Sequence, residues 1–270
     1  MKLEVLVVTM GRSDLSLAEK MNIRQDALIA NQCGKWDFDE AQTQYGTVRM
    51  LSSDTVGVGT NRNLALALSQ GDILLFADDD LVYYDDLREV IRAFEELPQA
   101  DVIAFSLDQT KNGEIFRRYR HPVRRCHTWN CLKFGGCVLA VRREAYLRAN
   151  LSFSRLFGGG CPYSSGEDSL FILDCIRKGL KFYSHSYVLG RTGKDESSWF
   201  TGYNKKYFYD KGALIAAAFP HTGFLMRWYF ALHYRKKTDL SVLECVRLMR
   251  RGQKGFRTLE TWQEEPAAVC

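Results

Sequence analysis

Three carboxylates stand side by side where an apolar run of residues ends. Asp78, Asp79 and Asp80 follow the segment 72–77 (DILLFA), which has the composition of a buried β-strand. Carboxylates this close repel one another unless a cation neutralises them. Their oxygens suit Mg²⁺ or Mn²⁺, which also hold substrate phosphates. We therefore predict a divalent-cation site at Asp78 and Asp80, the alternative being a solvated turn that caps the next helix.

A second polar group precedes a predicted helix. The segment 57–66 (GVGTNRNLAL) has two glycines and a polar cluster before good helix formers. This order places backbone N–H groups and Arg62 at a helix N-terminus, which suits a phosphate or the edge of a base. A plain helix cap is the alternative. Thr9 and Arg12, at the end of the first apolar run, are predicted to lie beside the same ligand.

A third group combines two acids with another helix start. In the segment 164–171 (SSGEDSLF), Glu167 and Asp168 fall in the first turn of a predicted helix. One interpretation is a capping box whose acids complement the helix dipole. The other is that one acid is a general base, since a helix N-terminus favours the ionised carboxylate that a base requires. The segment alone leaves both interpretations open.

Other enzyme classes with similar acids are poorly supported. No GxxxxGK[ST] loop of a P-loop ATPase occurs, and the GVG at 57–59 lacks the third glycine of a dinucleotide-binding fingerprint. A glycosidase needs two separated carboxylates rather than three adjacent ones.

The elements that position these residues alternate along the first hundred positions. Apolar runs predict strands, and amphipathic spacing predicts helices. The predicted strands cover residues 3–9, 27–31, 47–51 and 72–77, and the predicted helices cover 60–69 and 85–97. This βαβα alternation indicates an α/β fold with a doubly wound, mostly parallel sheet flanked by helices. In such sheets ligands bind beyond the carboxyl ends of the strands.

The remainder of the 270-residue chain is less regular. Short strands are predicted at 102–107, 138–141 and near 182–187, with a helix at 165–178 and mainly helices thereafter. We predict one catalytic domain, 1–218, made of a nucleotide-binding half (1–100) and an acceptor-binding, catalytic half (101–218). A helical, basic C-terminal appendage is predicted at 219–270.

Positive charge is concentrated in that appendage. Residues 222–257 contain nine Lys and Arg residues and two acidic ones, a net charge of +7 within a chain of net charge +5. The rest of the chain is therefore slightly acidic, which argues against nucleic acid as a partner. A basic amphipathic region suits an anionic membrane surface. Helices that cover the domain and display a basic outer face are an equal alternative.

The apolar segments are too short for a membrane span or a signal peptide. The N-terminal run ends at Val8 and is soon followed by Arg12, and no uncharged apolar stretch of about 18 residues occurs. The eight cysteines have no paired CxxC spacing, as expected of reduced thiols. We expect a cytoplasmic protein, with peripheral attachment to the inner face of the membrane as the open question.

Together these segments resemble glycosyltransferase family 2, which has the GT-A fold, over about residues 3–215. The similar features are an N-terminal strand, a G-x-G-x-x-R-N helix start, a DDD strand end, GED before an apolar pair, and SSWFTGYNKKYF at 197–208. DDD and GED are each moderately specific, whereas their order and separation are strongly so.

The resemblance implies an inverting transfer from a nucleoside-diphosphate sugar, with uridine as the expected base, to an acceptor hydroxyl. It further implies a divalent cation, Mn²⁺ or Mg²⁺, bound at the DxD pair. The acceptor would be a saccharide or a lipid-linked saccharide, as in the synthesis of bacterial surface polysaccharides. Two alternatives remain: a non-catalytic nucleotide-sugar-binding scaffold, and a sugar nucleotidyltransferase of similar fold.

The resemblance also suggests roles for single residues. Asp78 and its neighbour Asp79 would contact the nucleotide sugar, and Asp80 would bind metal and diphosphate. Asp168 would be the base, with Glu167 as the alternative.

Thr9, Arg12 and Arg62 would lie at the nucleotide. One departure concerns the turn after the second strand, where the family has an acid that holds the uracil or ribose. This chain has Asn31 and Gln32 there. Because an amide both donates and accepts hydrogen bonds, Asn31 is predicted to take the place of that acid.

Overall fold

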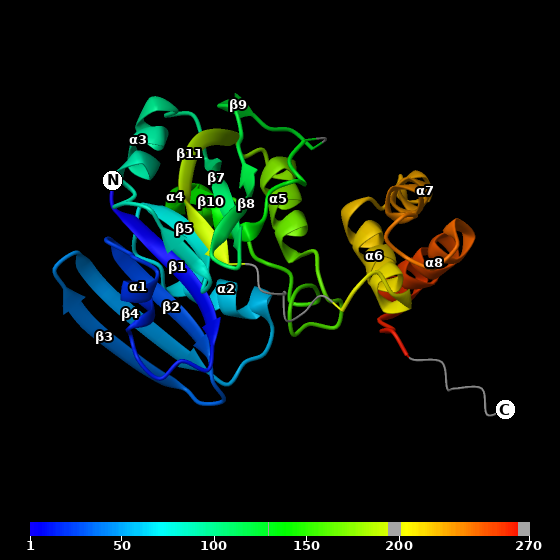
Figure 1. Ribbon diagram of the computed structural model, residues 1–270, viewed down its shortest axis with the longest axis horizontal. Coiled ribbons are helices and arrows are strands. Elements are labelled where there is room, and N and C mark those ends of the chain that lie inside the picture. Colours follow the sequence, from blue (N-terminus) through cyan, green and yellow to red (C-terminus); the bar gives the residue numbers. More distant parts are fainter. Residues whose placement is uncertain (129, 194–200, 264–270) are drawn as a thin grey trace.

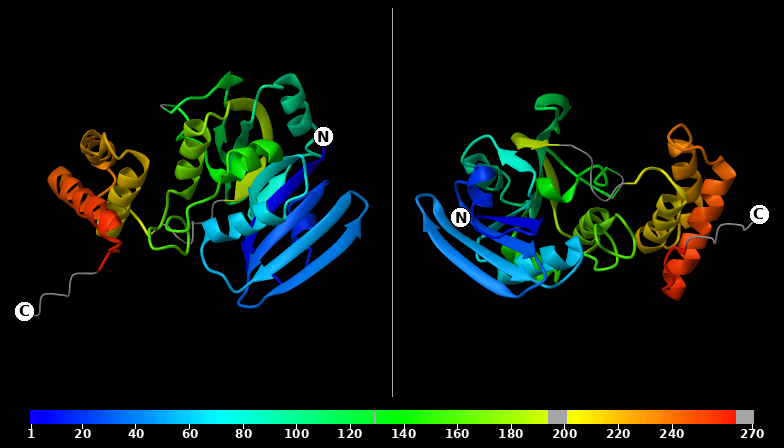
Figure 2. Two further views of the ribbon diagram at one scale, coloured as in Figure 1. Left: turned by 180° about the vertical axis from the view of Figure 1, so that it is seen from behind. Right: turned by 60° about the horizontal axis from the view of Figure 1, so that its bottom comes forward.

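The computed structural model describes residues 1–128, 130–193 and 201–263. An α/β part holds most of the chain, and three C-terminal helices form a unit beside it (Figure 1). Figure 2 shows the same separation in two further views.

The strands are β1 (Leu3–Met10), β2 (Asp26–Gln32), β3 (Asp37–Thr43), β4 (Gly46–Ser53), β5 (Ile73–Asp78), β6 (Leu81–Tyr83), β7 (Val102–Lys111), β8 (Glu114–Tyr119), β9 (Arg124–Arg125), β10 (Leu139–Arg142) and β11 (Phe182–Gly193). The helices are α1 (Leu17–Lys20), α2 (Val58–Leu68), α3 (Arg88–Glu96), α4 (Arg143–Arg148), α5 (Glu167–Arg177), α6 (Lys205–Ala218), α7 (Gly223–Tyr234) and α8 (Val242–Thr258), with a 3₁₀ turn at Gly136–Val138.

One mixed sheet forms the centre of the α/β part. Its strand order is β3-β4-β2-β1-β5-β10-β7-β11-β6, with β8 beside β7 and β9 beside β11. The strands β4, β2, β1 and β5 are parallel, and so are β7 and β11, whereas β10 runs antiparallel between the two groups. The predicted α/β fold with helices flanking a large sheet is confirmed.

The antiparallel edge strand β3 was not predicted. Its sequence, DFDEAQT, has no continuous apolar run, and every residue in it is exposed. It lies at the edge of the sheet beside β4, from which a tight turn separates it. A strand that buries neither face leaves little hydrophobic signal in the sequence.

The register of the parallel strands brings the predicted ligand-binding residues to one edge. Thr9 of β1 lies opposite Asn31 of β2, and Val8 lies opposite Asp78 of β5. All three strands end within two residues of these positions, so their carboxyl ends meet at the same edge of the sheet, as expected of ligand-binding sites in such folds.

Aromatic packing fixes α5 against this edge. The ring of Phe171 in α5 stacks on Phe153, with ring centroids 4.1 Å apart, and meets the edge of Phe76 in β5 at 5.6 Å. All three side chains are buried. Because aromatic contacts of this kind dominate core packing, they hold the first turn of α5 next to the end of β5.

The C-terminal helices pack closely on one another. A Cβ atom on Gly212 of α6 would lie 2.1 Å from the Met249 carbonyl oxygen, and one on Gly252 of α8 would lie 1.9 Å from that of Tyr209. The backbones of α6 and α8 can approach this far only because glycine occupies both positions. Replacement of either glycine would force the two helices apart.

The helical unit begins earlier than the sequence predicted. Since α6 packs on both α7 and α8, the predicted division at residue 219 falls within the unit. The apolar residues Cys245 and Met249 of α8 are buried in this packing. Among the described residues, no helix has both the length and the apolar composition to cross a bilayer.

Candidate active site

A single arginine of α2 holds three carboxylates that come from two other elements, β5 and α5. Arg62 of α2 contacts Asp78, at the end of β5, through Nη2 at 2.8 Å. Its Nη1 contacts Asp168 at 2.5 Å and Glu167 at 3.3 Å, both in the first turn of α5. The DDD and GED motifs, some 90 residues apart in the chain, therefore meet at one guanidinium group.

The start of α2 is fixed so that Arg62 points inward. Asn61 donates to backbone carbonyls of β1 and β2. Asn63 both donates to and accepts from the backbone of Phe153, at 2.9 and 2.8 Å. The guanidinium carbon of Arg62 also lies 5.2 Å from the centre of the Phe153 ring, a cation–π arrangement. These contacts make Arg62 a rigid element of the site.

Two glycines allow the charged side chains to approach the backbone. A Cβ on Gly136 would lie 2.5 Å from Asp168 Oδ1 and 3.0 Å from the guanidinium carbon of Arg62. A Cβ on Gly158, whose φ is +110°, would lie 2.9 Å from the Glu167 carboxyl group. Any side chain at Gly136 would therefore displace the Arg62–Asp168 pair, and one at Gly158 would displace Glu167.

Negative charge exceeds positive charge in this cluster. Burial opposes the charge of Arg62, but the attraction of Asp168, Asp78 and Glu167 raises its pKa. Burial, followed by repulsion from Asp168, raises the pKa of Glu167 to about 7. The exposed fractions of the side chains are 13% for Glu167, 26% for Asp168 and 42% for Asp78. Asp168 and Asp78 are therefore the members most open to a ligand.

Asp79 belongs to a neighbouring cluster with Thr9 and Arg12. The Thr9 hydroxyl donates to Asp79 Oδ2, and Arg12 Nη2 contacts the same oxygen at 3.0 Å. Asn31 holds the turn that carries Arg12: its Oδ1 accepts from the Arg12 N–H, and its Nδ2 donates to the Arg12 carbonyl and to Ser52. The structure thus brings four of the predicted donor-binding residues together.

Two of the residues predicted to bind the donor, Asn31 and Arg62, are buried and already have protein partners. Asn31 is completely buried and its amide is hydrogen-bonded to the backbone of Arg12, so its contact with a base stays a prediction that would require these bonds to open. In the structure it positions Arg12. The side chain of Arg62 is only 3% exposed, and its terminal nitrogens contact carboxylates. Contact of Arg62 with a nucleotide would require these pairs to open.

The helix start at 57–66 is also covered. The N–H of Val58 donates to the carbonyl of Gly159 at 3.0 Å. The glycine-rich loop after Phe157 therefore caps α2 at Val58, and this amide could hold a phosphate only if the cap opened. The sequence could not show this cap because it comes from a segment about 100 residues away.

The third carboxylate of the triplet points elsewhere. Asp80 accepts a hydrogen bond from the Thr192 hydroxyl of β11. Burial raises the pKa of Asp80, and the like charges of Asp78 and Asp79 add to this effect. Within residues 1–128, 130–193 and 201–263, no three His, Cys, Asp or Glu groups converge as metal ligands. The three carboxylates instead have different partners, of which Thr192 had no signal in the sequence.

The central part of the chain matches a known family. Residues 37–151 match the sequence profile described as Glycosyl transferase family 2. This chain contains a glycosyl transferase family 2 domain. The matched segment includes Arg62 and the DDD triplet, so the predicted family and the prediction of a glycosyltransferase are confirmed. No curated protein sequence matches the chain significantly.

Solved structures support the fold of this glycosyltransferase. S. aureus TarS 1-349, crystallised with UDP-GlcNAc, is similar with a TM-score of 0.60 at 14% identity, over 99% of this chain and 95% of that one. The complex of the same fragment with UDP gives a TM-score of 0.61 at 14% identity over the same shares. A longer TarS structure gives 0.59 at 17% identity, over 89% of this chain and 44% of that one. The similarity confirms the GT-A-like fold.

Proposed function

We propose that this glycosyltransferase moves a sugar from a nucleoside-diphosphate sugar to an acceptor hydroxyl by an inverting single displacement. The observation that carries the proposal is the cluster in which Arg62 joins Asp78, at the end of a buried parallel strand, to Asp168, at the start of a helix. A donor-side carboxylate and a candidate base are thereby held at one point. The expected donor is a UDP-sugar, because the similar TarS structures were solved with UDP-GlcNAc and UDP.

Asp168 is the proposed base. Its Oδ1 is held by Arg62, while its Oδ2 accepts no hydrogen bond from the part of the chain that the structure describes. Oδ2 would take the proton of the acceptor hydroxyl as the acceptor oxygen bonds to the anomeric carbon. The bond from that carbon to the diphosphate breaks on the opposite face, and the nucleoside diphosphate leaves. No covalent sugar–enzyme intermediate forms.

Glu167 has a supporting part in this proposal. Its side chain is half as exposed as that of Asp168 and accepts from the N–H of Gly166 at 3.1 Å. It packs against Gly158 in the loop that caps α2. Glu167 would therefore hold the start of α5 and the loop in register, and Asp168 would meet the acceptor.

The second cluster is proposed to bind the nucleotide. The side chain of Arg12 is 41% exposed and that of Asp79 is 35% exposed, so both remain open to a ligand while they contact each other. Arg12 offers donors to the diphosphate or the base. Thr9 is buried beneath them and fixes Asp79 through its hydroxyl group. Arg62, in turn, is proposed to position Asp78 and Asp168 rather than to contact the nucleotide.

A divalent cation fits the acidic triplet. Desolvation and the like charges of Asp78 and Asp79 raise the pKa of Asp80, and a bound cation would relieve this repulsion. Asp80 would be the main ligand, with Asp78 beside it, because Mg²⁺ and Mn²⁺ are commonly held by one or two carboxylates and substrate phosphates. Such an ion would stabilise the charge on the departing diphosphate.

The acceptor is proposed to be a saccharide or a lipid-linked saccharide, in the synthesis of a bacterial surface polysaccharide. Several arginines lie within the proposed acceptor-binding half, residues 101–218. Arg120 contacts Asp108 at 2.7 Å, and Arg124 and Arg125 of β9 are exposed. These arginines would favour an acidic acceptor over a neutral one.

The proposal is tested with a panel of UDP-, GDP- and dTDP-sugars in the presence of Mn²⁺. We expect one donor to yield free nucleoside diphosphate by slow hydrolysis, and chelation to abolish this release. Release of pyrophosphate instead would indicate a nucleotidyltransferase. Donor binding in calorimetry without any turnover would indicate a scaffold, and unchanged release in excess chelator would exclude the metal.

A further inference from the structure

One face of the helix α7 is left exposed by the residues that the structure describes. Ala231, on its inner side, is completely buried in the helical unit. Leu225, Tyr229 and Leu232 follow the spacing i, i+4 and i+7, which places them on one side of the helix, and each is at least half exposed. Phe224, 62% exposed, extends the same face. Large apolar side chains exposed together in this way mark an interaction surface.

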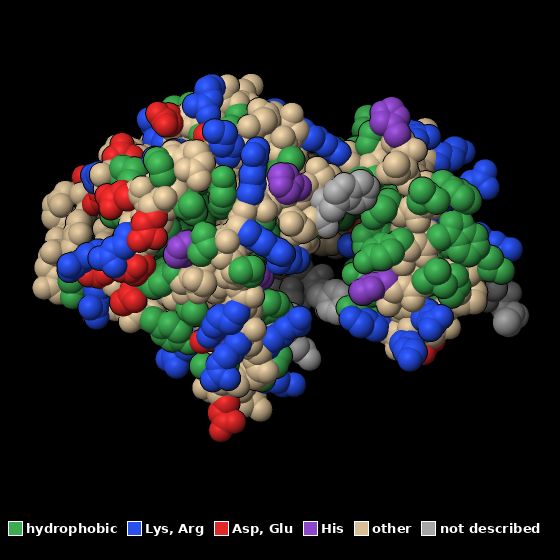
Figure 3. Space-filling model, turned by 90° about the horizontal axis from the view of Figure 1, so that it is seen from above, with side chains coloured by type: hydrophobic (Ala, Val, Ile, Leu, Met, Phe, Trp, Pro, Cys, Tyr) green, Lys and Arg blue, Asp and Glu red, His purple; other side chains and the backbone are tan. Residues whose placement is uncertain are grey.

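Cations surround this apolar face. Arg235, Lys236 and Lys237 follow α7 directly, and with Tyr229 and Leu232 they line an open depression of about 560 Å³. Figure 3 shows hydrophobic side chains gathered over the helical unit, with Lys and Arg side chains at its margins. The patch is thus apolar in the middle and positively charged around it.

The neighbouring helix α8 differs in how its apolar face is used. Cys245 and Met249 of α8 are buried against α6, together with the partly buried Val242 and Val246. The outer face of α8 carries several of the cations that give residues 222–257 their net charge of +7. Within the described part of the C-terminal unit, α7 therefore presents an exposed apolar face, whereas α8 mainly adds charge.

The pattern of charge decides between two occupants. A second copy of this chain, packed face to face on α7, would bring two rings of Lys and Arg together, which costs free energy. An anionic lipid surface offers the opposite charge to the ring and an apolar layer to the centre. Aromatic side chains such as Tyr229 are also favoured at the boundary between lipid and water.

We propose that α7 lies on an anionic membrane surface, with Phe224, Leu225, Tyr229 and Leu232 inserted among the acyl chains and the cations around them on lipid phosphates. The helix has 12 residues, so it lies in the interface rather than across the bilayer. This docking is independent of the transfer reaction and would bring the enzyme to the surface where lipid-linked acceptors are found.

The test uses the full chain and vesicles of two compositions. The protein is sedimented with phosphatidylcholine vesicles and with vesicles that contain phosphatidylglycerol. We expect sedimentation with the anionic vesicles only, and release by about 1 M salt, at which the Debye length falls to about 3 Å. Equal recovery in the supernatant with both vesicle types would overturn the proposal.

Two variants separate the apolar and the charged contributions. The change Leu225→Ser with Leu232→Ser removes apolar insertion, and its control is Leu147→Ser, a leucine of α4 that is 52% exposed. The change of Arg235, Lys236 and Lys237 to Gln removes three charges. At about 1 kcal/mol per cation near the surface, it should weaken binding to anionic vesicles by about 100-fold.

The control for charge is Arg88→Gln, Arg92→Gln and Arg148→Gln, three exposed arginines of α3 and α4. This variant should bind anionic vesicles nearly as the wild type does. All variants should retain donor binding, which establishes that they fold. Equal losses in the test and control variants would overturn the assignment to α7. A dimer in sedimentation that Leu225→Ser and Leu232→Ser dissociate would assign the face to a second copy instead.

Discussion

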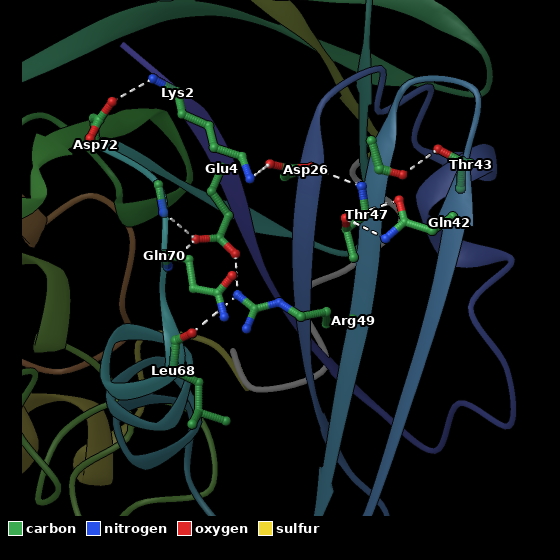
Figure 4. A network of polar contacts seen from close by, with 12 residues as sticks. Lys2, Glu4, Asp26, Gln42, Thr43, Thr47, Arg49, Leu68, Gln70 and Asp72 are labelled. Atoms are coloured by element: carbon green, nitrogen blue, oxygen red, sulfur yellow. Dashed lines mark hydrogen bonds and ion pairs between the residues drawn. The ribbon is translucent and has the colours of Figure 1, made fainter.

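Arg49 and Arg62 are both buried in the α/β part, and their surroundings differ. Arg49 of β4 contacts Glu4 of β1 at 2.5 Å, and it also donates to the carbonyl of Leu68. The second oxygen of Glu4 accepts from the N–H groups of Gln70 and Gly71 (Figure 4). One positive charge meets one negative charge, and the carboxylate of Glu4 is satisfied on both oxygens.

Arg62 meets three carboxylates, two of which are partly exposed. Asp78 and Asp168 are 42% and 26% exposed, whereas Glu4 is 3% exposed. A balanced, closed pair such as Arg49–Glu4 is what a structural contact requires. An excess of negative charge that remains open to solvent favours a cation or a proton transfer. The comparison therefore favours the carboxyl edge of the sheet as the reactive one.

The largest expected effect comes from loss of the Arg62 charge. Arg62→Gln leaves three carboxylates without their cation, and removal of one partner of a buried ion pair costs about 3–5 kcal/mol. We expect a loss of this size in the free energy of unfolding, measured by urea denaturation, and no detectable transfer. Arg62→Lys keeps the charge but cannot contact three groups. Its stability and its transfer activity should therefore lie between those of the wild type and those of Arg62→Gln. If Arg62→Gln were as stable as the wild type, the proposed difference between the surroundings of Arg62 and Arg49 would be contradicted.

The Arg49–Glu4 pair should affect stability alone. Arg49→Met leaves Glu4 buried and unpaired, at a cost of about 3–5 kcal/mol. Glu4→Gln added to Arg49→Met removes that charge and still accepts from the backbone, so the double variant should recover at least ~1 kcal/mol in urea denaturation. Turnover per folded molecule should match the wild type in both. A loss of turnover per folded molecule in either variant would show that the Arg49–Glu4 pair contributes to function as well.

The sequence predicted where the acidic triplet lies in the fold, but it did not predict which residues pair with Arg62. The apolar run before Asp78 and the βαβα order predicted that the triplet ends a parallel strand at the ligand-binding edge, and the register confirms this placement. The pairing of Arg62 with Glu167 and Asp168 was not predicted, because an ion pair across more than 100 residues leaves no local pattern.

The C-terminal helices show a second limit of sequence patterns. Cys245 and Met249 stand four residues apart in α8, as on one apolar helix face, but such spacing in a sequence cannot say whether the face is covered. Only the packing on α6 settles that question. The open face proved to be on α7, whose many aromatic residues gave no clear polar and apolar sides in the sequence.

A smaller effect should appear in the dependence of stability on pH. The pKa of Glu167 is raised to about 7 in the folded protein, from an ordinary value of 4.5, so the folded state binds more protons between these values. Stability should therefore fall as the pH rises from about 5 to about 8. Glu167→Gln should lack this component, measured as the difference in Tm between wild type and variant at each pH. If the curves of Tm against pH for the wild type and Glu167→Gln ran parallel, the burial of the Glu167 carboxyl group would be contradicted.

The most direct test of the central claim compares the two acids of α5 in the transfer reaction. Asp168→Asn removes the basic oxygen with little change of shape, so transfer should fall by about 10²- to 10⁴-fold. Donor binding in calorimetry should be nearly unchanged. Glu167→Gln, the matched control in the same helical turn, should cost less. If Asp168→Asn retains near-normal turnover while Glu167→Gln has none, the base is Glu167; if neither change reduces transfer, this edge of the sheet is not the catalytic site.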